Sequence, residues 1–208
     1  MKKGTLLVIS GFAGSGKGTI VKRLLSEYDT YSVSVSATTR APRPGEVDGK
    51  DYFFVTKEKF EEMIADDEFL EYARYVDNYY GSPRGYVDKM LDEGRDVILE
   101  IEQQGALKVK AGRPDALLMF VMPPSVREIY NRLKKRGTES EEVIMKRMHQ
   151  GAREADVIEK YDYLIINDDL GECVRNVHET VCCSKYAAVR NKELIDRIRS
   201  EFNDFLNV

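Results

Sequence analysis

The chain has 208 residues, of which 42% are hydrophobic and 33% charged, and this composition is typical of a soluble globular protein with a substantial core. Its 36 acidic and 32 basic residues leave a formal net charge of -4, so it lacks the overall positive charge that attracts nucleic acid. No stretch approaches the roughly 20 apolar residues of a membrane-spanning helix. We therefore expect one main domain that binds neither nucleic acid nor a membrane.

The N-terminal segment predicts a buried strand rather than a secretory signal peptide. Residues 6–9 are apolar, but the run breaks at once into a glycine-rich loop. A signal peptide requires a longer apolar region and a small-residue cleavage site. We therefore expect a cytoplasmic protein. The three cysteines have neither metal-binding nor disulfide spacing and are interpreted as ordinary helix residues.

Short apolar runs rich in branched residues predict four parallel strands, at residues 6–9, 97–101, 117–122 and 163–166. Helix signals lie between these runs: Ser82-Pro83 begins a helix that Gly94 ends, and a second helix follows residues 123–125 and ends at Gly137. This alternation predicts an α/β fold with a central parallel sheet and helices on both faces.

Two inserts interrupt the alternation. Residues 31–82 contain alternating or aromatic segments separated by prolines and glycines, which predicts a small, mostly antiparallel β-rich insert. Residues 134–154 predict a helical insert, whose helix begins at a capping box formed by Thr138 and Glu141. The core then comprises residues 1–30, 83–133 and 155–208.

The C-terminal segment predicts a helix with an apolar stripe formed by Leu194, Ile198, Phe202, Phe205 and Leu206. We expect this stripe to pack against its own domain. Contact with a second copy in a homo-oligomer is the alternative.

Residues 11–19 have the sequence Gly-Phe-Ala-Gly-Ser-Gly-Lys-Gly-Thr, between a predicted strand and a predicted helix, as in a phosphate-binding loop (P-loop). The glycines allow backbone N–H groups to surround a polyphosphate, and Lys17 reaches the terminal phosphates. The residue after the lysine is Gly18, so the hydroxyl that usually binds Mg²⁺ lies one residue later, on Thr19. We expect Mg²⁺ to be held partly through water. The predicted ATP-binding loop consists of Gly11, Phe12, Ala13, Gly14, Ser15, Gly16, Lys17, Gly18 and Thr19.

Residues 36–52, Ser-Ala-Thr-Thr-Arg-Ala-Pro-Arg-Pro-Gly-Glu-Val-Asp-Gly-Lys-Asp-Tyr, resemble the signature of guanylate kinases. The resemblance continues in the family's order over nearly the whole chain, through Glu71 and residues 78–82, 100–105, 123–125, 136–139 and 166–169. It implies a P-loop kinase fold that uses Mg²⁺ and transfers the terminal phosphoryl group of ATP to GMP in purine nucleotide metabolism. The β-rich insert would bind GMP and the helical insert would form a lid. We also expect dGMP to be used, because no residue is assigned to the ribose 2′-hydroxyl.

The resemblance implies two groups of acceptor-binding residues. Around the GMP phosphate it places Arg40, Arg43, Tyr52 and Tyr80, and around the guanine it places Ser36, Glu71 and Ser82. Arginine pairs with two phosphate oxygens at once, and tyrosine donates from a rigid ring. A carboxylate at Glu71 would accept from guanine N1–H and from the 2-amino group, neither of which adenine offers. Glu71 is therefore the predicted specificity residue.

The resemblance also implies residues for the donor side and the metal. Glu100 lies where guanylate kinases carry an acidic residue near GMP and Mg²⁺, and with Thr19 it forms the predicted metal site. The lid arginines that would neutralise the transferred group are Arg132, Arg136 and Arg147, of which Arg147 also reaches GMP. Asn167 would contact adenine. The predicted catalytic residues are Lys17, Arg40, Arg136 and Arg147.

Two other functions fit the same fold. Guanylate-kinase-like modules of scaffold proteins bind partner proteins and lack an effective phosphate loop, whereas the glycines and Lys17 are intact here. A kinase for another small molecule is the second alternative. The presence of Ser36, Glu71 and Ser82 favours GMP as the acceptor.

Overall fold

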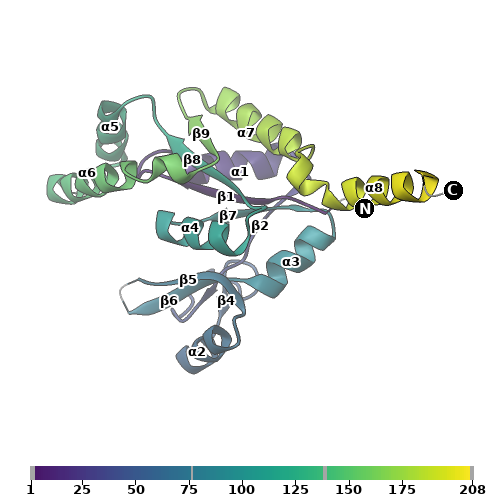
Figure 1. The fold of residues 1–208 in the computed structure, drawn as a ribbon. Helices are drawn as coiled ribbons and strands as arrows, with labels where there is room; N and C mark the ends of the chain where they lie inside the picture. The colour runs from purple at the N-terminus through teal and green to yellow at the C-terminus, as the bar shows by residue number, and fades with distance from the viewer. Residues whose placement is uncertain (1–2, 76, 138–139, 207–208) are drawn as a thin grey trace.

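The computed structural model of the chain describes residues 3–75, 77–137 and 140–206 (Figure 1). Its centre is a five-stranded sheet with the strand order β2-β7-β1-β8-β9, in which every neighbouring pair is parallel. These strands are β1 (Leu6–Gly11), β2 (Tyr31–Val33), β7 (Asp96–Glu100), β8 (Leu117–Met122) and β9 (Tyr163–Ile166). The predicted α/β fold with a central parallel sheet is confirmed.

Alternate residues of the central strand β1 face two separate apolar clusters. Leu6 and Val8 pack with α3 (Arg84–Asp92), α4 (Gln103–Gly112) and α5 (Val126–Arg136) on one face of the sheet. Leu7 and Ile9 pack with α1 (Lys17–Glu27) and α7 (Leu170–Ser184) on the other face. Because helices cover both faces, β1 has apolar residues at consecutive positions instead of alternating with polar ones.

A second, smaller sheet has the order β4-β3-β6-β5 and lies apart from the central sheet, next to α2 (Lys57–Ala65) (Figure 1). Phe60 of α2 stacks on Phe69 and Tyr79, with ring centroids 4.4 and 5.2 Å away. Its strands are β3 (Ala37–Thr38), β4 (Phe53–Phe54), β5 (Phe69–Tyr75) and β6 (Asn78–Pro83). Only the pairing of β3 with β4 is parallel, so this sheet is mostly antiparallel, as predicted for the insert.

The prediction that the first alternating segment belongs to the insert is wrong. Strand β2 pairs in parallel with β7 at the edge of the central sheet, where Tyr31 lies opposite Asp96. An edge strand covered on one side alternates apolar and polar residues just as a strand of a small insert does. The pattern alone therefore could not distinguish the two sheets.

Helix α6 (Glu141–Ala155), in the predicted lid, begins differently from the prediction. Its N-cap is Ser140, whose hydroxyl accepts from the backbone N–H of Val143. Thr138, the predicted cap, lies outside the described residues. With Ser140 as the cap, Glu141 occupies the first helical position, where its negative charge favours the helix N-terminus.

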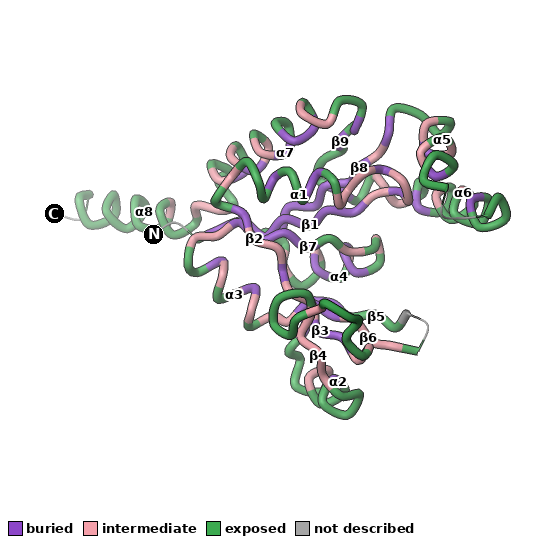
Figure 2. Tube along the Cα trace, turned by 180° about the vertical axis from the view of Figure 1, so that it is seen from behind, coloured by how far each residue is buried: buried purple, intermediate pink, exposed green. Residues whose placement is uncertain are grey.

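The C-terminal helix α8 (Lys192–Leu206) extends away from the rest of the domain and none of its described residues is buried (Figures 1 and 2). The chain also forms two short 3-10 helices: η1 (Ile158–Lys160) precedes β9, and η2 (Ala188–Arg190) directly precedes α8. The residues of the predicted apolar stripe are between 40% and 80% exposed. The prediction that this stripe packs against its own domain is wrong, because helical periodicity identifies an apolar face but not what covers it. The homo-oligomer stays a prediction, which light scattering in solution would check.

None of the described helices combines the length and apolar composition that crossing a bilayer requires.

Candidate active site

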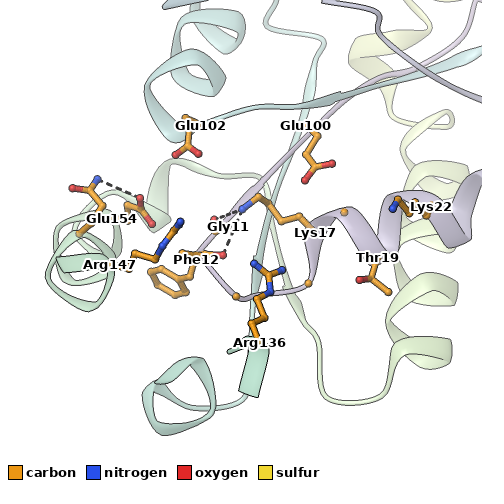
Figure 3. A pocket seen from close by; sticks show the side chains of 15 residues that line it. Gly11, Phe12, Lys17, Thr19, Lys22, Glu100, Glu102, Arg136, Arg147 and Glu154 are labelled. Atoms are coloured by element: carbon orange, nitrogen blue, oxygen red, sulfur yellow. Dashed lines mark hydrogen bonds between the residues drawn. The ribbon is translucent and has the colours of Figure 1, made fainter. Parts of the chain in front are cut away.

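A cavity of about 440 Å³ opens at the carboxyl ends of β1 and β7, between the loop of residues 11–19 and residues of α5 and α6 (Figure 3). Parallel sheets of this kind commonly bind ligands at this edge. The side chains of Lys17, Arg136 and Arg147 all point into this space (Figure 3). Its walls are formed by Gly11, Phe12, Ala13, Gly14, Gly16, Lys17, Gly18, Thr19, Lys22, Glu100, Glu102, Arg136, Arg147, Gln150 and Glu154. The predicted P-loop except Ser15, both predicted metal-site residues and two of the predicted lid arginines therefore share one cavity. Arg132 and Asn167 do not line it.

The P-loop turns into α1 through Gly16, which adopts φ 91° and forms the N-cap of the helix. A side chain is strained at this angle, and a Cβ at Gly16 would also lie 2.4 Å from Asn167 Nδ2. That amide nitrogen donates to the carbonyl oxygen of Ser15 at 2.8 Å, in the interior. Asn167 therefore supports the loop from behind.

Arg132 belongs to the same support. Its Nη2 donates to the carbonyl oxygen of Asn167 at 2.9 Å, and its Nε pairs with Glu128 at 2.7 Å. The resemblance to guanylate kinases implied that Arg132 neutralises the transferred group of ATP and that Asn167 contacts its adenine. In this structure their side chains hold the protein backbone next to the loop.

Replacing Asn167 with alanine should leave the buried Ser15 carbonyl without its partner. We expect a loss of about 1–3 kcal/mol in the free energy of unfolding and a raised KM for ATP, with a smaller change in the KM for GMP. Chemical unfolding and steady-state kinetics would measure both. The control is Asn203→Ala on the exposed helix α8. An Asn167→Ala protein with unchanged stability and unchanged KM for ATP would contradict this role.

Lys17 begins helix α1, and its ammonium group donates to the carbonyl oxygen of Gly11 at 2.7 Å and lies 3.5 Å from that of Phe12 (Figure 3). The side chain is thus curled back over its own loop, at the centre of the cavity. Arg136 comes from the end of α5 and Arg147 from α6, so three cationic groups from three helices surround the same space. Such an arrangement suits a ligand with several negative charges.

Glu154, in the last turn of α6, is a cavity residue that sequence reasoning missed. Its carboxyl group is buried, and burial raises its pKa, with the negative charge of Glu102 acting in the same direction. A hydrogen bond from Gln150 Nε2, 3.2 Å from Oε1, and attraction to Lys17 act in the opposite direction. The residue type and its charged neighbours in sequence are typical of a solvated helix face, so no local signal distinguishes it.

Glu100 and Thr19 provide oxygen atoms beside the P-loop. A Cβ at Gly18 would lie 3.6 and 3.8 Å from the two carboxylate oxygens of Glu100, so the carboxylate lies next to the first turn of α1. Among the described residues, no three His, Cys, Asp or Glu side chains gather in a way that could hold a metal ion. A few oxygen donors fit Mg²⁺, because this ion keeps several of its waters when bound.

Three of the predicted phosphate-binding side chains gather beside the small sheet. The Arg40 guanidinium lies 5.4 Å from the centre of the Tyr52 ring, and the Tyr52 and Tyr80 rings are 6.1 Å apart. Arg40 also forms a two-pronged ion pair with Glu46, at 3.0 and 2.8 Å. The Arg40 guanidinium, helped by the backbone N–H of Arg43, lowers the pKa of Glu46. Glu46, which lies within the predicted signature, orients Arg40.

Arg43 of the predicted phosphate group and Ser36 of the predicted guanine group are less enclosed. Arg43 is exposed, and its backbone bonds to Glu46 twice: its N–H donates to the carboxylate at 2.7 Å, and its carbonyl oxygen accepts from the Glu46 N–H at 3.0 Å. Ser36 is half-buried before β3, where its carbonyl oxygen accepts from the N–H of Phe53 at 2.9 Å.

Glu71 and Ser82 face each other across the β5–β6 pair. The Ser82 hydroxyl donates to Glu71 Oε1 at 2.9 Å, and the two residues are 0% and 8% exposed, respectively. Burial raises the pKa of Glu71, whereas the Ser82 hydrogen bond and the positive charge of Lys108 lower it. A buried carboxylate with one oxygen already fixed is a rigid acceptor for a planar donor pair.

Comparisons with known proteins indicate one family. The guanylate kinase family model matches residues 3–183. The guanylate kinase of Caldanaerobacter subterraneus subsp. tengcongensis is 50% identical over 200 residues, which is 96% of this chain and 97% of that protein. The guanylate kinase of Clostridioides difficile is 50% identical over 195 residues, or 94% of this chain and 95% of that protein. The crystal structure of guanylate kinase from Anaplasma phagocytophilum has a TM-score of 0.73 and 32% identity, with 97% of each chain covered. The chain belongs to the guanylate kinase family.

Proposed function

We propose that this chain transfers the γ-phosphoryl group of ATP to GMP, giving ADP and GDP. The observation that carries the proposal is the convergence of Lys17, Arg136 and Arg147 on one cavity beside the P-loop. Relatives named guanylate kinase match nearly the whole chain at about half identity, which supports GMP as the acceptor.

The nucleophile in this reaction is a phosphate oxygen of GMP, which is already ionised at neutral pH. The protein therefore needs no catalytic base, and its task is to align the two phosphates and to neutralise charge. Lys17 and the lid arginines Arg136 and Arg147 stabilise the phosphoryl group during its transfer, because negative charge spreads over its oxygens. Closure of the lid would exclude water and so prevent hydrolysis of ATP.

The donor phosphates would be held by the backbone N–H groups of the P-loop at the positive end of α1. Arg132 and Asn167 support ATP binding through the loop that they brace. Glu100 and Thr19 would hold Mg²⁺, directly or through water. The ion supplies partial neutralisation of the donor phosphates.

The acceptor would be held at two places. Its phosphate would bind Arg40, Arg43, Tyr52 and Tyr80. Glu100 and Arg147 would also contact GMP, from the cavity. Its guanine binds Ser36, Glu71 and Ser82. No residue is assigned to the ribose 2′-hydroxyl, so dGMP is also a substrate in this proposal.

The proposal also assigns a role to each part of the predicted domain division. The core would bind ATP, the β-rich insert within residues 31–82 would bind GMP, and residues 134–154 would close as the lid. The cytoplasmic location, and the absence of nucleic-acid and membrane binding, stay predictions from the sequence.

A coupled ADP-release assay with GMP, dGMP, AMP, CMP and UMP tests the proposal. We expect GMP to be the best acceptor, with dGMP also used and the other three far weaker, because only guanine offers N1–H together with a 2-amino group. A clear preference for AMP would refute the acceptor assignment. Absence of turnover with all five nucleotides would favour a binding module instead.

A further inference from the structure

Helix α4 of the core lies directly against the carboxylate of Glu71, which belongs to the small sheet. The point of contact is Gly105, in the first turn of α4, where the residue is buried. A Cβ placed on Gly105 would lie 2.8 Å from Glu71 Oε2, 3.2 Å from its Cδ and 3.4 Å from its Cγ. A methyl carbon and a carboxylate group do not approach so closely unless one of them is displaced. The Glu71 carboxylate therefore occupies the space that a side chain at position 105 would need.

Neither side of this contact can withdraw easily. The other oxygen of Glu71, Oε1, is held by the Ser82 hydroxyl at 2.9 Å in the interior. On the helix side, Ala106 and Val109 are fully packed in the core cluster beneath the central sheet. An added methyl group would thus push the carboxylate out of place, rather than shift the helix.

The helix end also favours a negative charge at this position. The N–H of Ala106 makes the first hydrogen bond within α4, to the carbonyl oxygen of Glu102. The N–H groups of residues 103–105 are consequently at the free, positive end of the helix. Glycine at position 105 lets a buried carboxylate come close to that end.

We propose that Gly105 is a positioning residue for guanine selection, which it performs by fixing where the Glu71 carboxylate stands. This inference rests on the proposed role of Glu71. A carboxylate that accepts from N1–H and the 2-amino group together must present both oxygens in the plane of the base. A displaced carboxylate keeps one of these bonds at most. The loss falls on GMP more than on IMP, which has N1–H but lacks the 2-amino group.

The test compares Gly105→Ala with Gly112→Ala, a matched control at the end of the same helix. A Cβ on Gly112 would meet nothing within 4 Å. For Gly105→Ala we expect a KM for GMP raised roughly tenfold or more, a smaller ratio of kcat/KM for GMP over IMP, and an unchanged KM for ATP. Gly112→Ala should leave all three values as in the parent protein.

A double-mutant cycle separates positioning from general damage. Glu71→Asp withdraws the carboxylate from position 105, so adding Gly105→Ala to Glu71→Asp should cost much less than it costs the parent protein. If Gly105→Ala alone does not fold, Glu71→Asp should restore folding. Additive effects, or a failure to restore folding, would overturn the inference.

The two assignments fail in different ways. A Gly105→Ala protein with parental GMP kinetics and parental GMP-to-IMP ratio, alongside a Glu71→Gln protein that uses GMP poorly, would refute Gly105 alone. Normal use of GMP by Glu71→Gln would refute the guanine-binding role of Glu71 instead.

Discussion

Replacing Lys17 with alanine is expected to lower kcat by roughly 10²- to 10³-fold, because the variant loses a preorganised positive charge at the group being transferred. Lys17 lies at the centre of the cavity, and its ammonium is already directed inward over the loop. The coupled ADP-release assay at saturating ATP and GMP would measure the loss. Nearly normal formation of GDP would exclude Lys17 from the chemistry.

The control for Lys17→Ala is Arg23→Ala. Arg23 lies on the same helix and pairs with Glu27 on the exposed face, so its removal changes the charge of α1 equally without entering the cavity. We expect its kcat to stay near that of the parent protein. Thermal unfolding of both variants is needed as well, because Lys17 also donates to the carbonyl oxygen of Gly11.

Replacing Glu71 with glutamine is expected to lower kcat/KM for GMP by roughly 10- to 150-fold, which corresponds to about 1.5–3 kcal/mol. Glutamine keeps the shape of the side chain but presents only one acceptor oxygen, so it cannot accept both guanine donors. The KM for ATP should change little, since Glu71 does not line the cavity at the P-loop. An equal loss of ATP affinity would make Glu71 a structural residue.

The raised pKa of Glu71 adds a dependence on pH. In the folded protein the buried carboxyl group binds its proton more tightly than in the unfolded chain, so its contribution to stability is full below the unfolded pKa. That contribution is lost as the pH rises through the folded pKa. At neutral pH, Glu71→Gln should therefore unfold at the same temperature or a higher one. In the parent protein, the KM for GMP should rise as the pH falls through the folded pKa, and this rise should be absent in Glu71→Gln.

Contiguous patterns in the sequence determined most of the donor side. The strand at residues 6–9, the glycine-rich loop and the helix beginning at Lys17 follow one another directly, so local spacing was enough to predict the P-loop. The apolar runs at 117–122 and 163–166 coincide with β8 and β9. The composition of β8 is that of a strand buried on both faces, whereas β9 is an edge strand with only Ile165 buried. The arginine and tyrosine positions of the insert came from the resemblance to a family.

The tertiary structure alone decided the contacts that link distant parts of the chain. Asn167 reaches the loop at Ser15, and Gly105 faces Glu71, although no periodicity or motif connects either pair. The same holds for the carboxyl of Glu154 beside the P-loop. A sequence pattern records how one segment alternates, whereas these contacts depend on how separate elements pack. For that reason the sequence predicted the fold and the phosphate loop, and only the packed structure brought Asn167 to the loop and Gly105 to the Glu71 carboxylate.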